Sequence, residues 1–329
     1  MRIFQLSSGD LVADRRASYA VALAREGDHL SAAELMEQTL ELVPGWAAGW
    51  CLLGDYRAEA GNGPAAIEAY RELARHDVDG VFGAALKLAA MGVSPAPLGT
   101  ETAYVESLFD DYAGRFETEL VVGLGYEAPA RLAELIAAEL EAQRVEQVGL
   151  ALDLGCGTGL MGERLRRSAS FIEGVDLSGE MIDVAAKKGI YDRLVKGELT
   201  AHLAAHPGGI DLISAADVLN YCGALPPVLA AVEARLAPGG LFAFTLERHD
   251  GPEALVLQPS LRYRHGAAAA RAACIEAGFE LVVFEAAVLR RDRGEPVMGM
   301  MALVRKPLKA KARLAEEAAA PMVLTELPN

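Results

Sequence analysis

Three closely spaced glycines occur in the run at residues 151–159, which reads ALDLGCGTG. This run follows an apolar stretch and precedes a helical one. Gly155, Gly157 and Gly159 allow the chain to turn tightly and let a ligand lie against bare backbone near a helix N-terminus. The pattern therefore predicts a binding site for a nucleotide-like cofactor.

The identity of that cofactor has two readings. Residues 157–162 satisfy the GxGxxG pattern of dinucleotide-binding proteins, and Asp176 follows where an acid that binds ribose is expected. Asp153, however, would place negative charge beside a pyrophosphate, whereas it suits a ligand with an ammonium and a sulfonium. Two final strands joined by the short turn 290–295 must pair antiparallel, which fits no ordinary dinucleotide domain. A nicotinamide dehydrogenase stays the less favoured alternative.

The elements that position these residues alternate between strand and helix from residue 148 onward. The apolar runs predict strands, and the Ala-rich runs between them predict helices. Strands are expected at 148–154, 171–175, 193–196, 210–215, 240–246, 279–288 and 296–304, with a loop at 247–265. Strands that alternate with helices predict a parallel sheet covered by helices on both faces.

Four motifs occur in order along this region: LDLGCGTG, GVDLS, LAPGG and AGFE, the last before the terminal hairpin. Together they resemble a class I S-adenosylmethionine-dependent methyltransferase, over about residues 105–305. The resemblance implies an α/β, Rossmann-like fold with a seven-stranded sheet and an antiparallel C-terminal hairpin. It also implies S-adenosylmethionine as the cofactor.

The resemblance assigns cofactor contacts to individual residues. Asp176 would accept hydrogen bonds from both ribose hydroxyls, although it could also cap the following helix. Leu177 and Met181 would pack on the adenine, and Glu198 stands where the family often has Asp. The complete implied set is Asp153, Gly155, Cys156, Gly157, Gly159, Asp176, Leu177, Met181, Glu198, Leu199, Ala216, Asp217 and Tyr112.

A segment that could cover the cofactor precedes the sheet. Residues 109–116 read FDDYAGRF and resemble a segment that closes over the cofactor in many small-molecule methyltransferases. Tyr112 and Phe116 are four residues apart, so they share one helical face and could exclude water. The same spacing also fits an amphipathic helix packed on the sheet.

Residues that could act on the methyl acceptor follow the fourth and fifth strands. After the fourth strand the sequence reads AADVLNY, not the Asn/Asp-Pro-Pro-aromatic run typical of enzymes that methylate amides or base amines. Tyr221 in this run could face the substrate. Asp217 and Asn220 have no second acidic ligand at a clear spacing, so no metal site is predicted.

The loop at 247–265 is basic or neutral within an acidic region. His249 and His265 are candidate general bases, because histidine exchanges protons near neutral pH. Arg262 and Arg264 could bind a carboxylate or phosphate of the substrate. The alternating residues also fit a short strand with one solvated face.

The first hundred residues carry a faint 34-residue repeat, the period of a tetratricopeptide unit. Trp50, Leu53, Gly54, Ala66 and Tyr70 match the repeat positions. We therefore expect an all-α, tetratricopeptide-like domain at 1–98, a linker and lid helices at 99–146, the methyltransferase domain at 147–305 and a flexible tail at 306–329. The combination is similar to bacterial predicted methyltransferases with tetratricopeptide repeats. A generic helical hairpin domain is the alternative.

Composition limits the partners. The chain has 329 residues, 52% hydrophobic and 23% charged, and a formal charge of −15, which disfavours wrapping a nucleic acid. It shows no secretory signal and no apolar stretch long enough to span a membrane, and its four cysteines form no CxxC pair, so we expect a cytoplasmic protein.

Three functions remain open. The first is methyl transfer to an oxygen or nitrogen atom of a small, anionic or neutral metabolite. The second is a protein methyltransferase that recruits its target through the helical repeats, which could also mediate self-association. The third is a non-catalytic scaffold that binds the cofactor.

Overall fold

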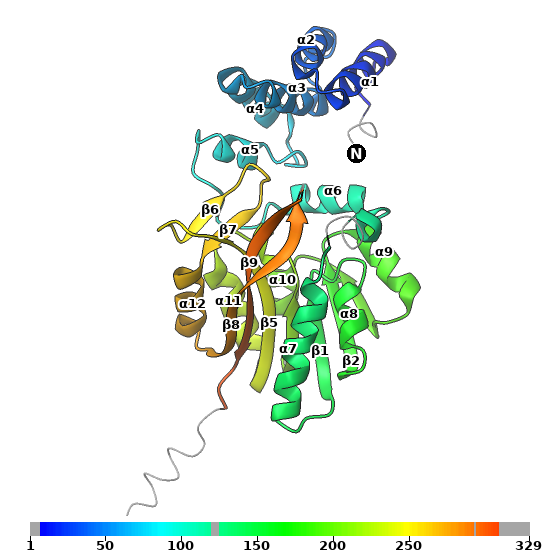
Figure 1. The fold of residues 1–329 in the computed structure, drawn as a ribbon. Helices are drawn as coiled ribbons and strands as arrows, with labels where there is room; N and C mark the ends of the chain where they lie inside the picture. Colours follow the sequence, from blue (N-terminus) through cyan, green and yellow to red (C-terminus); the bar gives the residue numbers. More distant parts are fainter. Residues whose placement is uncertain (1–6, 120–124, 293, 309–329) are drawn as a thin grey trace, which may run out of the picture.

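The N-terminal part is entirely helical in the computed structural model, which describes residues 7–119, 125–292 and 294–308 (Figure 1). Successive helices pack against each other through small residues, and Gly54 lies so close to the Tyr70 ring that a Cβ there would be 2.2 Å from it. The helices are α1 (Leu11–Arg25), α2 (His29–Leu40), α3 (Ala47–Glu59), α4 (Gly63–His76) and the shorter α5 (Ala84–Ala90).

Side-chain caps define where several of these helices begin. Asp10 accepts hydrogen bonds from the first-turn amides of α1, Asp28 accepts one from Ser31 in α2, and Asn62 accepts one from Ala65 in α4. Each cap satisfies a backbone donor that has no partner within its helix. The local sequence therefore sets the helix starts, and burial of the small residues sets their packing.

A mixed sheet forms the second part of the molecule. Five strands run parallel in the order β3-β2-β1-β4-β5, and β9 pairs antiparallel with both β5 and β8. The strands are β1 (Val148–Leu154), β2 (Ala169–Asp176), β3 (Arg193–Lys196), β4 (Ile210–Ala215), β5 (Leu236–His249), β8 (Glu280–Asp292) and β9 (Glu295–Arg305). The terminal hairpin is antiparallel because a short turn joins its strands.

The sheet differs from the expected seven strands, because the described residues form nine. The two additional strands, β6 (Leu255–Leu257) and β7 (Tyr263–Gly266), lie in the segment predicted as a loop. β5 runs on to His249 and pairs with β7 there, and β7 pairs antiparallel with β6. The segment 247–265 is therefore a β-ribbon that extends the sheet, not a loop.

Helices cover both faces of the sheet. Adjacent residues of β1 point to opposite faces: Ala151 packs with α7 and α8, whereas Leu152 packs on the side of α10, α11 and α12. This alternation is the pattern of a strand buried on both sides. The helices of this part are α6 (Thr102–Tyr112), α7 (Ala128–Ala142), α8 (Leu160–Leu165), α9 (Gly179–Lys188), α10 (Leu199–Ala205), α11 (Leu225–Arg235), α12 (Ala267–Glu276) and the 3₁₀ turn η3 (Leu219–Tyr221).

The segment 92–100, which contains two prolines and two glycines and is called the linker below, attaches the N-terminal helices to the β6–β7 ribbon. The Tyr263 hydroxyl donates to the Pro97 carbonyl, and the Ala224 amide donates to the Leu98 carbonyl at 3.0 Å. Leu86 of α5 packs with Leu261 and Tyr263. Figure 1 shows α5 between the other N-terminal helices and β6. The predicted linker is thus a packed part of the structure.

Two remaining expectations concern cysteines and the tail. All four cysteines are buried free thiols. Within the described residues, no helix combines the length and the apolar character needed to cross a membrane. Most of the expected flexible tail, residues 309–329, lies outside the part of the chain that the structure describes.

Candidate active site

A cavity of about 390 Å³ opens at the carboxyl ends of the parallel strands. Gly155 after β1, Asp176 at the end of β2 and Ala216 after β4 line one side of it. Helix α6 supplies the facing wall, with Phe109 and Tyr112 among its lining side chains. Ligands of open α/β sheets bind at this edge, so the cavity is the candidate active site.

The glycine loop is shaped by left-handed backbone at each of its three glycines. The φ angles of Gly155, Gly157 and Gly159 are 62°, 52° and 94°. A Cβ on residue 155 would lie 2.4 Å from Val218, so both conformation and close packing require glycine there. The loop therefore brings bare backbone to the cavity.

Asp176 connects this loop to helix α9. Its carboxylate accepts from the Gly157 amide and from the Ser178 amide, both at 2.8 Å. Burial raises the pKa of Asp176, and the backbone donors partly oppose that shift. The Ser178 hydroxyl caps α9, so the cap is Ser178 and not Asp176, which lines the cavity.

Asp153 lies beneath the loop and does not line the cavity. Its two oxygens accept from the Ser214 hydroxyl and the Tyr191 hydroxyl, each at 2.7 Å. Burial raises its pKa to about 6. The Tyr191 ring in turn packs against Gly159 and Gly162. Asp153 therefore supports the loop from beneath, and its expected contact with the cofactor stays a prediction.

The other expected site residues divide into two groups. Cys156, Gly157, Gly159 and Met181 do not line the cavity, and Met181 is buried in α9. Glu198 caps α10 through the Ala201 amide and also lines the cavity. The expected residues that the structure brings together along the cavity are Gly155, Asp176, Leu177, Glu198, Leu199, Ala216, Asp217, Tyr112, Tyr221 and Arg262.

Helix α6 lies over the cavity and is held to the sheet at its end. Asp110 accepts a hydrogen bond of 2.6 Å from the Ser178 hydroxyl. Phe109 meets Tyr221 edge to face, with ring centroids 5.3 Å apart, and Tyr112 meets Phe116 at 5.5 Å. The segment therefore packs on α9 and forms a wall of the cavity, and its closing over the cofactor stays a prediction.

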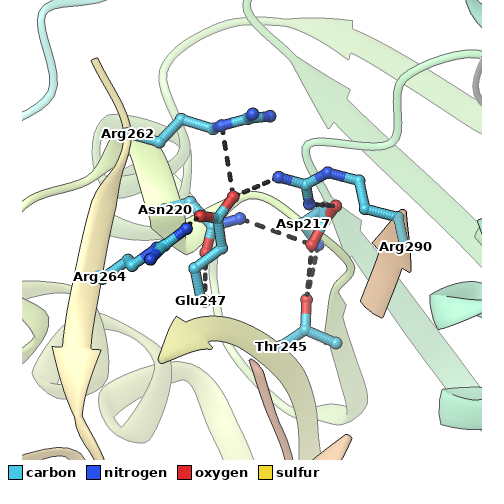
Figure 2. A network of polar contacts seen from close by, with 7 residues as sticks. All are labelled: Asp217, Asn220, Thr245, Glu247, Arg262, Arg264 and Arg290. Carbon is cyan, nitrogen blue, oxygen red and sulfur yellow. Dashed lines mark hydrogen bonds and ion pairs between the residues drawn. The ribbon is translucent and has the colours of Figure 1, made fainter. Parts of the chain in front are cut away.

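A largely buried polar network lies on the side of the cavity that is lined by Asp217, Arg262 and Arg290 (Figure 2). This side is called the acceptor side below. Arg290 donates to Asp217 at 2.6 Å and also to Glu247, whose side chain is 2% exposed. Arg262 and Arg264 approach the same Glu247 at 3.3 Å and 3.5 Å. Three guanidiniums therefore surround two carboxylates beside the cavity.

Backbone groups hold the acids of this network in place. Asp217 has a left-handed φ of 59°, and its amide donates to the Thr245 hydroxyl at 2.8 Å. The side-chain oxygen Oδ1 of Asn220 accepts from the Glu247 backbone amide at 2.8 Å. Asp217 and Asn220 thus serve the network, and the described residues hold no group of three or more potential metal ligands.

Neither candidate histidine lines the cavity. His265 is buried in β7, where its Nε2 lies 2.9 Å from the Gly223 carbonyl and burial lowers its pKa. The Nδ1 of His249 accepts from the Gly251 amide at 3.1 Å. Arg264 is also absent from the lining. Strand alternation explains the position of His265, because it directs Arg264 toward Glu247 and the next residue, His265, to the opposite face.

Sequence reasoning missed Arg290 and Glu247. Arg290 is 3% exposed and directly follows the apolar residues 286–289 of β8, and Glu247 is a buried acid that ends the apolar run of β5. A charge inside an apolar strand pattern is a usable signal, because a buried charge needs a partner. Sequence alone does not identify that partner.

Residues 152–244 match the family described as methyltransferase domain. The chain contains a methyltransferase domain. The sequence motifs and this match agree on a domain of the class I S-adenosylmethionine-dependent type, for which S-adenosylmethionine is the expected cofactor. The cavity fits that cofactor: the loop offers backbone without side chains, Asp176 offers a buried carboxylate, and Leu177 and Leu199 offer apolar surface.

Individual relatives match parts of the chain. A ubiquinone biosynthesis O-methyltransferase of Pectobacterium carotovorum subsp. carotovorum is 30% identical over 103 residues, which cover 30% of this chain and 43% of that protein. The match thus spans less than half of the curated relative. The crystal structure of the [4+2]-cyclase SpnF aligns with a TM-score of 0.50 and 19% identity, over 64% of this chain and 98% of its own. The structural likeness concerns the fold.

Proposed function

We propose that the protein transfers a methyl group from S-adenosylmethionine to an oxygen or nitrogen atom of a small metabolite, and that an anionic metabolite fits best. One observation carries the proposal. A single cavity is lined by Gly155 and Asp176 of the cofactor motifs and also by Tyr221, Arg262 and Arg290, which no cofactor motif requires. A cofactor and a methyl acceptor bound by these residues would therefore meet in one cavity.

The cofactor supplies an electrophilic methyl group when it is bound. Asp176 would accept hydrogen bonds from the vicinal hydroxyls of a ribose, and Leu177 and Leu199 would contact a flat base. The aromatic side chains of α6 exclude water from the cavity. The chain's main contribution is to hold the two ligands in line, since fixed orientation alone removes much of the barrier.

Binding of the cofactor is the first test. Calorimetry with S-adenosylmethionine is expected to give saturable binding that Asp176→Ala weakens at least tenfold. Asp183→Ala is the matched control, because Asp183 is an exposed acid on the neighbouring helix α9, and it leaves the affinity unchanged. Folded wild-type protein that gives no binding would remove the proposed function.

Turnover is the second test. S-adenosylhomocysteine release is measured across a panel of carboxylic acids and phenols. Release in the presence of a small acceptor supports methyl transfer. Cofactor binding without release on any acceptor leaves the non-catalytic scaffold as the function.

We further propose that residues 1–98 form a tetratricopeptide-like domain, 99–146 the linker and lid, and 147–305 the methyltransferase domain. The close crossing of α3 and α4 at Gly54 and Tyr70 supports repeat-like helix pairs. Contacts of Pro97 and Leu98 with the methyltransferase part mean that a cut at residue 98 would damage that part as well. Point variants therefore test the N-terminal helices better than their deletion.

A further inference from the structure

The network at the acceptor side carries excess positive charge. Arg262, Arg264 and Arg290 face Glu247 and Asp217, so three cations meet two anions. Arg290 is 3% exposed and pairs with both carboxylates, so the excess positive charge lies on Arg262 and Arg264, whose side chains are 24% and 38% exposed. The cavity is the open side of this network, because Arg262, Arg290 and Asp217 line it. An anion bound in the cavity would balance the charge.

The two lining arginines keep donors for such an anion. A guanidinium has five N–H groups, and Arg290 uses two nitrogens on Asp217 and Glu247. Arg262 also hydrogen-bonds the Tyr221 side chain, and Figure 2 shows no dashed line from its terminal nitrogens to the other residues drawn. Planar, paired donors match a carboxylate in a bidentate geometry.

The rest of the acceptor side is aromatic. Phe109, Tyr104 and Tyr126 line the cavity, and Tyr221 lines it against Phe109. These residues come from α6, from the segment before α7 and from η3, so flat apolar surface surrounds the arginines. A flat apolar body with one carboxylate is the ligand that this combination matches.

The lining also bears on the atom that accepts the methyl group. Among the lining residues that the structure describes there is no histidine. The acids there are engaged: Asp176 with two amides, Glu198 with the Ala201 amide, and Asp217 with Arg290. Residues 120–124 read LVVGL and carry no ionisable side chain. A phenol or ammonium would need a base, whereas a carboxylate carries no proton to remove.

We propose that the methyl acceptor is the carboxylate of a small aromatic acid, bound by Arg262 and Arg290. This inference rests on the proposed function. One carboxylate oxygen forms a bond to the methyl carbon with its lone pair while the carbon–sulfur bond breaks and its electrons pass to sulfur. No proton is released, and the positive sulfonium becomes a neutral thioether. The neutral methyl ester has no charge for the arginines, which favours its release.

Binding tests this inference independently of turnover. Calorimetry is done on the full chain saturated with S-adenosylhomocysteine, with benzoate and 2-naphthoate as probes and benzamide and methyl benzoate as neutral counterparts. The acids are expected to bind at least tenfold more tightly than the neutral compounds. Equal binding of acid and amide, or tighter binding of phenyl phosphate than of benzoate, would overturn the inference.

Matched variants locate the carboxylate. Arg262→Gln and Arg290→Gln are expected to lose at least tenfold in benzoate affinity with unchanged S-adenosylhomocysteine affinity. Arg248→Gln removes the same charge from β5 outside the cavity, where Arg248 pairs with Asp250, and retains benzoate binding. If Arg290→Gln does not fold, the benzoate affinity of Arg262→Gln alone tests the inference. The Arg262 side chain is 24% exposed, so its replacement is expected to leave the fold intact. Full benzoate affinity in Arg262→Gln overturns the inference.

A probe with two acceptor groups tests the reacting atom. With 4-hydroxybenzoate as substrate, mass spectrometry is expected to find the methyl ester in one-to-one amount with S-adenosylhomocysteine. The aryl methyl ether would instead show that the phenol reacts, and the inference would fail while methyl transfer stands. Failure of S-adenosylhomocysteine to bind in any arm would be failure of the proposed function.

Discussion

Asp153 is a carboxylate held under the glycine loop by two hydroxyl donors. Hydroxyl donors stabilise its charged form, but burial opposes them and raises the pKa of Asp153 to about 6, from 3.8 for the unfolded chain. The folded protein therefore binds this proton more tightly than the unfolded chain does. The resulting stabilisation is complete below about pH 4 and is lost as the pH rises through about 6.

Asp153→Asn should remove this pH dependence, because an amide does not titrate. The free energy of unfolding of the wild type, measured relative to the variant, is expected to fall by about 3 kcal/mol between pH 4 and pH 7. Urea denaturation at a series of pH values measures it. Parallel pH profiles for the two proteins would show that the carboxylate is not penalised by burial.

Two glycines of the loop offer a matched comparison. Gly155 and Gly157 both have left-handed φ, but a Cβ at 155 would overlap Val218, whereas a Cβ at 157 has nothing within 4 Å. Gly155→Ala is therefore expected to cost at least about 1 kcal/mol more than Gly157→Ala, because only the first adds a clash to the same backbone strain. Thermal unfolding without cofactor measures the difference. Equal losses would contradict the close packing at Val218.

The cofactor side of the cavity was more predictable from sequence than the acceptor side. Gly155, Asp176 and Glu198 each follow a strand of a parallel sheet, and such strand ends meet at one edge whatever the rest of the fold does. Arg290 lies 73 residues beyond Asp217 on an antiparallel hairpin, and sequence does not give the register of that pairing. The loop predicted at 247–265 brings His265 to the site, whereas in the structure β7 turns His265 away from the cavity, which agrees with the alternative of a short strand.

At the scale of elements, the β6–β7 ribbon links the acceptor side to the N-terminal helices. Tyr263 in β7 is buried, and its hydroxyl donates to the Pro97 carbonyl of the linker. Its neighbour Arg262 lines the cavity. The linker therefore helps to fix the position of a proposed acceptor-binding residue that is far from it in sequence.

Tyr263→Phe keeps the ring and removes this hydrogen bond. The variant is expected to lose about 1 kcal/mol in free energy of unfolding and severalfold in benzoate affinity, with S-adenosylhomocysteine affinity unchanged. Calorimetry and urea denaturation measure these quantities. Tyr19→Phe, at an exposed tyrosine of α1, is the control and changes none of them. If Tyr263→Phe lowers the free energy of unfolding but not the benzoate affinity, Tyr263 has a structural role only.

At the scale of the whole molecule, α5 joins the two parts through opposite sides. Lys87 pairs with Asp55 of α3 at 2.6 Å, while the preceding residue, Leu86, packs on Leu261 and Tyr263. Unfolding of one part would therefore expose apolar surface on the other. Both tryptophans, Trp46 and Trp50, belong to the N-terminal part, so their fluorescence reports on that part alone.

Ligand binding should therefore stabilise helices that the ligand never touches. S-adenosylhomocysteine at 100 times its Kd stabilises the folded domain by about 2.7 kcal/mol. The urea midpoint of the wild type, followed by tryptophan fluorescence, is therefore expected to rise when this ligand is added. Leu86→Ala leaves a cavity at the junction and is expected to abolish that rise. Leu73→Ala, buried within the N-terminal helices, lowers the midpoint but preserves the rise. A wild-type urea midpoint that does not change when the ligand is added would mean that the two parts unfold independently.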